Sequence, residues 1–273
     1  MLRESGVRDT APIADQGVYV WLAHLDDPTV DVAWCCRVLS TAERDRASRF
    51  AFVEHRRRYV VSHAALRSVL ASCLRVPPED LQFSTGLDGK PVLTPPCVQF
   101  NLSHSNGVAL IAVARTRQVG VDVERVSQDV PVLELARRFL SAEAVAVLAA
   151  LPTSLRRLAF FKCWTAREAF AKARGTGLDE EANGFEIVPT QDGARVVGTA
   201  SNWSLSELQL PDGYVGAVVS ENRASVARLD RSPDGGDGAG AIDLQAWLWR
   251  KPLVARSEDR IARKPGNGAG DAT

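Results

Sequence analysis

Strands and helices follow one another twice in the same order along this chain. In the first pass, alternating apolar residues predict a strand over 17–25, which helices and then short strands follow up to about residue 115. In the second pass, a strand over 119–124 precedes helices over 132–175 and further strands. Because each pass keeps its helices together, the pattern favours an α+β fold of two similar halves over a repeated βαβ winding.

The chain is expected to contain four segments, of which two are the halves, at 17–115 and 116–228. A flexible N-terminus at 1–16 precedes the first half. The final segment, 229–273, is rich in Gly, Pro and Asp. Its low content of apolar side chains leaves it without a core, so we expect it to be largely disordered.

Composition excludes several classes of protein. The 273 residues include 33 basic and 33 acidic side chains, so no net charge attracts nucleic acid in bulk. No apolar run reaches the roughly 18 residues of a membrane-spanning helix, which excludes a membrane protein. The N-terminus lacks an apolar signal core, and the five cysteines form no CxxC pair, so we expect a cytoplasmic protein with reduced thiols.

The strand Val119–Glu124 has two carboxylates at alternate positions. Asp122 and Glu124 point to the same side of this strand, since side chains alternate with a period of two. Two adjacent carboxylates repel each other unless a positive charge lies between them. A hard divalent cation such as Mg²⁺ fits this position. The alternative is a solvated strand end with no ligand.

A long helix in the second half has a second group of polar residues. Trp164, Glu168 and Lys172 lie on one face of this helix because they are four residues apart. Glu168 is a candidate third carboxylate near the metal, and Lys172 is a candidate phosphate contact. The alternative is a surface ion pair between Glu168 and Lys172, beside a tryptophan of the core.

Two further motifs precede these carboxylates. The segment Phe100–Ser105 ends a strand with Ser103 and His104, which can both donate hydrogen bonds to phosphate oxygens. Lys90 lies in the turn Gly89-Lys90-Pro91, close to the predicted sheet. A structural histidine and an ordinary turn lysine are the alternatives for these two motifs.

Taken together and in this order, the motifs closely resemble those of the Sfp-type 4′-phosphopantetheinyl transferases, in the holo-acyl-carrier-protein synthase superfamily. The motifs are G-K-P, N-L-S-H-S, V-G-V-D-V-E and W-x-x-R-E-A-x-x-K. The intervals are similar too, with eighteen residues from His104 to Asp122 and some forty from Glu124 to Glu168. The resemblance extends over about 17–220. It implies the family fold, with two similar α/β halves related by a pseudo-twofold axis, and a monomer.

The resemblance also implies a reaction. Members of this family move the phosphopantetheine arm of coenzyme A onto a serine hydroxyl of a carrier protein and release adenosine 3′,5′-bisphosphate. The implied cofactor is Mg²⁺, and coenzyme A is a substrate. The implied partners are acyl or peptidyl carrier domains of polyketide, nonribosomal peptide or fatty acid synthases.

Site residues follow from the resemblance position by position. It assigns the metal to Asp122, Glu124 and Glu168, and the phosphates to Lys172. It assigns the nucleotide part of coenzyme A to Lys90, Ser103 and His104. Arg46 and Arg58 are our candidates for a further phosphate contact, in a region where Arg56, Arg57, Arg58 and Arg67 are expected to form one basic helical face. An amphipathic surface explains these arginines equally well.

Glu168 is our candidate base for the serine proton, directly or through a metal-bound water. Lys172 is expected to stabilise charge on the transferred or departing phosphate. The sequence departs from the family pattern at Arg167, where the family usually has lysine. Arginine keeps the positive charge but does not transfer protons, so we give Arg167 no proton-transfer role.

Two other functions remain open at this level. A degenerate homologue would bind coenzyme A or a carrier protein without catalysis, although such a protein has no need of three convergent carboxylates. A metal-dependent phosphohydrolase would use the same carboxylates on another phosphate ester. The motifs around Lys90 and His104 disfavour it, because the family uses them for coenzyme A.

Overall fold

The structure is a computed structural model that describes residues 17–86, 89–175, 185–190, 194–198, 202–221 and 255–256. The segment 1–16, predicted to be flexible, lies outside the described residues. So does most of the segment 229–273, predicted to be disordered.

The N-terminal half contains three helices, one short 3₁₀ helix and five strands within its described part. They are β1 (Val18–His24), α1 (Val32–Val38), α2 (Thr41–Ser48), α3 (Val53–Leu74), η1 (Pro78–Asp80), β2 (Phe83–Thr85), β3 (Pro91–Leu93), β4 (Gln99–Ser105) and β5 (Val108–Ala114). Strands β1, β5 and β4 form an antiparallel sheet in that order.

The C-terminal half repeats this plan. Its elements are β6 (Val119–Arg125), α4 (Val132–Phe139), α5 (Ala142–Ala150), α6 (Thr153–Arg174), β7 (Phe185–Pro189), β8 (Ala194–Gly198), β9 (Trp203–Leu208), β10 (Tyr214–Glu221) and β11 (Ala255–Arg256). The main sheet has the order β11-β9-β10-β6, with antiparallel pairs throughout. The long helices of the two halves, α3 and α6, each have 22 residues.

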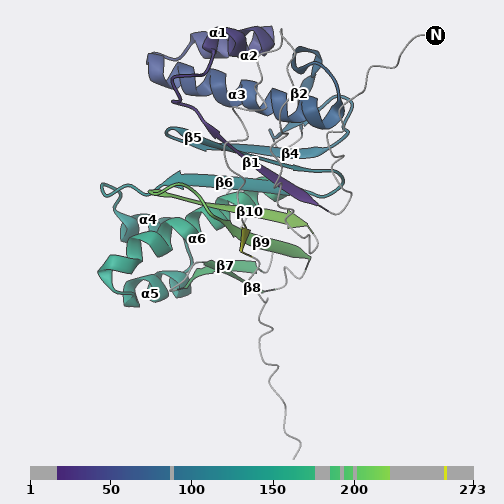
Figure 1. The fold of residues 1–273 in the computed structure, drawn as a ribbon. Helices are drawn as coiled ribbons and strands as arrows, with labels where there is room; N and C mark the ends of the chain where they lie inside the picture. The colour runs from purple at the N-terminus through teal and green to yellow at the C-terminus, as the bar shows by residue number, and fades with distance from the viewer. Residues whose placement is uncertain are drawn as a thin grey trace, which may run out of the picture.

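The two main sheets lie next to each other in the middle of the molecule, with α1–α3 outside one and α4–α6 outside the other (Figure 1). A core of small and branched apolar side chains joins the sheets, with Val18 and Leu110 from one and Val121 and Val218 from the other. The mixed class and the antiparallel sheets confirm the predicted α+β fold. The last strand of the first half ends at Ala114 and the first of the second begins at Val119, on either side of the expected boundary near residue 115.

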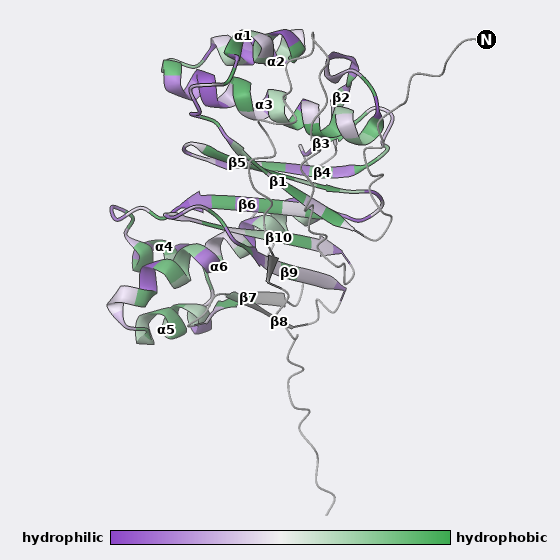
Figure 2. Cartoon of the chain, viewed as in Figure 1, coloured by the Kyte–Doolittle hydropathy of each residue, from purple (hydrophilic) through white to green (hydrophobic). Residues whose placement is uncertain are grey.

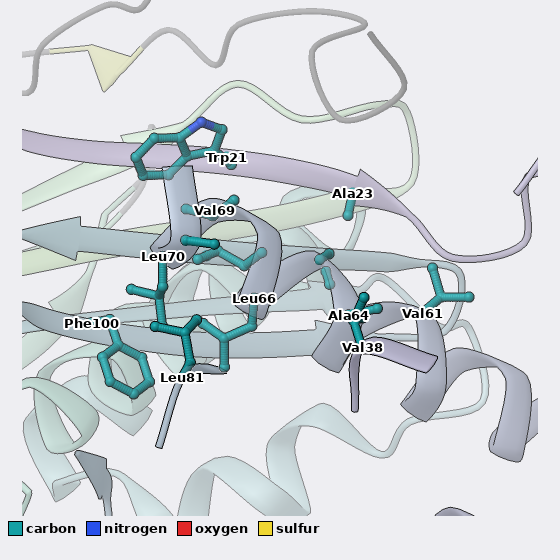
Figure 3. Close-up of a cluster of buried hydrophobic side chains, with 14 of the residues drawn as sticks. Trp21, Ala23, Val38, Val61, Ala64, Leu66, Val69, Leu70, Leu81 and Phe100 are labelled. Atoms are coloured by element: carbon teal, nitrogen blue, oxygen red, sulfur yellow. The ribbon is translucent and has the colours of Figure 1, made fainter. Parts of the chain in front are cut away.

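Each outer helical layer has its own core against its sheet. In the N-terminal half, Trp21 of β1, Leu70 of α3 and Phe100 of β4 belong to one buried cluster (Figure 3). Along α3, hydrophilic residues at 54–58 come first and mostly apolar residues follow (Figure 2), and 59–71 are buried or half-buried throughout. No helix in the described ranges is both long and apolar enough to cross a membrane.

Local signals in the sequence account for several helix ends. Ser40 and Glu43 form the capping box that begins α2, and Gly175 ends α6 with φ of 76°, in the left-handed region that favours glycine. Helix α1, of seven residues, was not predicted from the sequence. Asp31 caps its N-terminus, where the Asp31 side chain accepts a hydrogen bond from the backbone N–H of Trp34.

The expected basic face of α3 is wrong in one respect. Arg67 does not share an exposed face with the other arginines but lies in the core, at 1% exposure. Its guanidinium pairs with Glu43 at 2.8 Å and donates to the carbonyl oxygens of Pro78 and Leu81. A buried guanidinium requires such partners, and here they tie α2, α3 and η1 together.

Candidate active site

The two carboxylates of β6 lie where the halves meet. Asp122 Oδ1 accepts hydrogen bonds from Ser103 Oγ at 2.8 Å and from Lys172 Nζ at 2.6 Å. These contacts join β4, β6 and α6, since Lys172 is 50 positions from Asp122 along the chain. The Asp122 side chain is 4% exposed, and its Oδ2 is buried without a hydrogen-bond partner among the described residues.

The remaining carboxylates share this environment. Glu124 Oε2 accepts a hydrogen bond from Ser105 Oγ at 2.8 Å. Burial raises the pKa of Asp122, although the Lys172 ammonium opposes this shift. Burial also raises the pKa of Glu124 and of Glu168, and the negative charge of Asp122 adds to both shifts. The three carboxyl groups are therefore close enough to interact electrostatically.

Gly120 allows α6 to lie directly on β6. A Cβ atom at this position would lie 2.1 Å from the Ala169 carbonyl oxygen and 2.3 Å from the Ala173 nitrogen. Both are backbone atoms of α6, so no side-chain rotation could make room. This close approach brings the α6 residues Glu168 and Lys172 within reach of the β6 carboxylates.

We expect Gly120→Ala to destabilise the fold by about 3 kcal/mol, because the added methyl group forces helix and strand apart. Activity should fall with it, because the α6 side chains retreat from Asp122. Gly86→Ala is the matched control, since its Cβ would lie 3.1 Å from the Lys90 carbonyl oxygen, a contact that a small shift relieves. Urea unfolding of both variants measures the difference. Equal stability of the two variants would contradict the role given to Gly120.

Lys90 also contacts β6. Its Nζ donates a hydrogen bond to the Val119 carbonyl oxygen at 3.0 Å, and burial lowers the pKa of Lys90 to about 8. The structure therefore places Lys90 at the start of the strand that bears the carboxylates. Its contact with the nucleotide part of coenzyme A stays a prediction.

The two arginine candidates lie in different surroundings. Arg46 lies over the Tyr59 ring at 5.7 Å and lines a surface hollow of about 520 Å³ with Ala42, Arg49 and Phe50. Arg58 is held by two carboxylates, with contacts of 2.7 Å to Asp26 and 2.6 Å to Glu54. Arg46 is thus the arginine whose surroundings leave room for a ligand, whereas Arg58 belongs to an ion-pair network.

The pKa of His104 is lowered by its surroundings. Its side chain is exposed, yet partial removal from water and the charges of Lys172 and Arg58 lower its pKa. Burial lowers the pKa of its neighbour His63 to about 4, although the negative charge of Glu43 and a hydrogen bond to the Tyr59 carbonyl oxygen oppose the shift.

The oxygen atoms of the three carboxylates suit a hard cation, although the side chains are not arranged as a complete set of metal ligands. All three offer oxygen atoms, which Mg²⁺ prefers, and Asp122 Oδ2 is a free ligand atom. Within the part of the chain that the structure describes, no group of three His, Cys, Asp or Glu side chains is placed to hold a metal ion. Binding of one Mg²⁺ by Asp122, Glu124 and Glu168 stays a prediction.

Two residues of β4 near the site were not singled out from the sequence. Asn101 Oδ1 accepts a hydrogen bond from the Val121 N–H at 2.9 Å, and Ser105 Oγ contacts Glu124. Both share the alternate spacing of Ser103, so the period of two in the segment Phe100–Ser105 was the available signal.

Comparison with known proteins matches both halves. A model of the 4′-phosphopantetheinyl transferase superfamily matches residues 118–219, and one of the 4′-phosphopantetheinyl transferase N-terminal region matches residues 28–116. The chain is 38% identical over 206 residues to the 4′-phosphopantetheinyl transferase HetI of Nostoc sp., which covers 74% of this chain and 86% of the relative. It is 31% identical over 187 residues to the 4′-phosphopantetheinyl transferase Sfp of Bacillus subtilis, which covers 67% and 82%.

Acidic groups and a lysine at the junction of two similar halves form an arrangement that suits an enzyme acting on phosphate esters. The matches then show the particular family, because they extend over both halves and over most of two relatives. The chain belongs to the 4′-phosphopantetheinyl transferase family, whose members are enzymes. The resemblance inferred from the four motifs is confirmed.

Proposed function

We propose that this chain transfers the 4′-phosphopantetheine arm of coenzyme A to a serine hydroxyl of a carrier protein, with Mg²⁺ as cofactor, and releases adenosine 3′,5′-bisphosphate. The observation that carries the proposal is the contact between Lys172 Nζ and Asp122 Oδ1. It joins the helix motif to the strand motif, which supports a site that combines the proposed phosphate-binding ammonium with the proposed metal-binding carboxylates.

Each residue has a separate task in this proposal. Asp122, Glu124 and Glu168 would hold the cation, which neutralises charge on the diphosphate of coenzyme A when bound. Lys172 stabilises charge on the transferred or departing phosphate. Glu168 takes the serine proton, and burial suits it to this role because a raised pKa makes the carboxylate a stronger base.

Arg167 supplies charge without proton transfer. Its guanidinium is half-buried, and its positive charge opposes the rise in the pKa of Glu168. Arg167 directly precedes Glu168 in the sequence, so the two side chains lie on different faces of α6. Arg167 therefore tunes the site electrostatically, in the place where the family usually has lysine.

The proposed partners are acyl or peptidyl carrier domains of polyketide, nonribosomal peptide or fatty acid synthases, and we propose that the enzyme acts as a monomer. Mass spectrometry of a carrier domain incubated with the protein, coenzyme A and Mg²⁺ tests the proposal. An increase equal to one phosphopantetheine group supports transfer. An unmodified carrier that still co-elutes with the protein indicates a binding protein. Breakdown of coenzyme A with an unmodified carrier indicates a phosphohydrolase.

The raised carboxyl pKa values predict how the Mg²⁺ requirement changes with pH. Protons compete with the cation for Asp122, Glu124 and Glu168, because burial raises the pKa of each. Lowering the pH through these raised values should increase the Mg²⁺ concentration for half-maximal rate, while kcat at saturating Mg²⁺ falls less. Mg²⁺ titrations of the transfer rate at stepped pH measure this effect.

Acid unfolding is the competing explanation, and the sign of the shifts separates the two. A carboxyl whose pKa is higher in the folded chain than in the unfolded chain binds its proton more tightly when folded. Protonation of these three groups therefore stabilises the fold as the pH falls. Circular dichroism at each pH provides the control. A Mg²⁺ requirement that stays constant with pH would contradict the prediction.

A further inference from the structure

Three polar side chains of β4 line the free edge of β6. Strand β6 is the last strand of its sheet, so one edge has no strand partner within the described residues. Asn101, Ser103 and Ser105 occupy alternate positions on β4. Asn101 and Ser105 accept hydrogen bonds from backbone N–H groups of this edge, and Ser103 donates to the Asp122 side chain. The matching period of two in both strands pairs one hydroxyl with each carboxylate, Ser103 with Asp122 and Ser105 with Glu124.

The hydrogen bonds of Ser105 determine the direction of its proton. Its Oγ accepts from the Arg125 N–H at 3.1 Å and lies 2.8 Å from Glu124 Oε2. A hydroxyl has a single hydrogen, and an N–H group cannot accept it. The hydrogen of Ser105 therefore points at the Glu124 carboxylate, while its oxygen is anchored on the backbone of the same strand.

The neighbouring hydroxyl of Ser103 has a different anchor. Its Oγ accepts from Lys172 Nζ at 3.0 Å and donates to Asp122 Oδ1. That anchor is the end of a flexible side chain, whereas the anchor of Ser105 is a main-chain group in a paired strand. Ser105 thus holds Glu124 more rigidly than Ser103 holds Asp122.

We infer that Ser105 is a positioning residue, which restricts the Glu124 carboxylate on the side of β6 that bears Asp122 and so favours cation binding. The inference rests on the proposed function, since it requires Glu124 to be a metal ligand. Without this hydroxyl, Glu124 is free to rotate about its side-chain bonds. A residue that orients a metal ligand in this way typically changes metal affinity by about 10-fold to 100-fold when it is removed.

Direct Mn²⁺ binding tests the inference without turnover. Free Mn²⁺ is measured by electron paramagnetic resonance with the full chain, saturating coenzyme A and no carrier protein. We expect Ser105→Ala to weaken Mn²⁺ binding by about 10-fold. Ser105→Thr keeps the hydroxyl and should restore binding. Ser84→Ala, at an exposed serine of β2, is the matched control and should bind as the native chain does.

The outcomes separate this inference from the proposed function. Unchanged Mn²⁺ affinity in Ser105→Ala overturns the role of Ser105 and leaves the metal site intact. If Ser105→Ala and Ser105→Thr weaken Mn²⁺ binding equally, the effect comes from the changed size of the side chain. That result overturns the role of the hydroxyl. No Mn²⁺ binding by the native chain overturns the metal site, and the inference falls with it. A matching rise in the KM for Mg²⁺ in Ser105→Ala, with kcat retained at saturating Mg²⁺, supports the inference.

Discussion

Asp122→Asn is expected to lower kcat/KM for transfer by about 10³-fold, equivalent to ~4 kcal/mol of transition-state stabilisation. Asparagine has nearly the same volume as aspartate and can still accept the hydrogen bond from Ser103. It lacks the negative charge that pairs with Lys172 at 2.6 Å and that is proposed to bind the cation. Transfer assays at saturating Mg²⁺ measure the effect.

The fold of this variant should be retained. Burial disfavours the charged form of Asp122, as its raised pKa shows, so loss of the charge removes a cost of burial. The Lys172 side chain is 31% exposed, so water can solvate its ammonium once the partner is lost. Thermal melting checks this point, and Asp80→Asn, at an exposed aspartate of η1, is the control. Near-native turnover by Asp122→Asn would contradict the role in transfer that is given to Asp122.

Lys172→Ala is expected to lower kcat by about 10²-fold or more, because the site loses the charge that is proposed to stabilise the phosphate in the transition state. The matched control is Lys162→Ala on the same helix. Lys162 contacts Glu207 at 2.8 Å, away from the three carboxylates, so its loss should leave kcat unchanged and cost about 1 kcal/mol of stability at most. Steady-state kinetics and urea unfolding of both variants separate catalysis from stability.

The result for Lys172 has a clear alternative. If its only task were to neutralise Asp122, Lys172→Ala would lose stability while the chemical step continued at a near-normal rate. Substitution by arginine adds a second comparison, since Lys172→Arg keeps the charge but replaces a compact ammonium with a planar fork. Partial recovery in Lys172→Arg supports an electrostatic role, and full activity in Lys172→Ala contradicts it.

Signals between near neighbours in the sequence were sufficient for much of the fold. The capping box of Ser40 and Glu43 and the glycine at 175 are local signals that account for helix ends in the structure, because caps depend on residues within one turn. The same reasoning missed α1, whose seven residues give little hydrophobic periodicity. It also placed Arg67 on an exposed face, since charge pattern alone does not show that Glu43 lies opposite in the core.

The candidate site divides along the same line. The sequence by itself determined which chemistry is present, because Asp122, Glu124, Glu168 and Lys172 stand in the order and spacing typical of the family. Only the tertiary structure decided which of these groups touch. Lys172 reaches Asp122 because Gly120 lets α6 lie against β6, and Ser105 reaches Glu124 because β4 lies along the free edge of β6 in matching register. Both contacts depend on packing between elements far apart in the chain, which the local periodicity of each element does not specify.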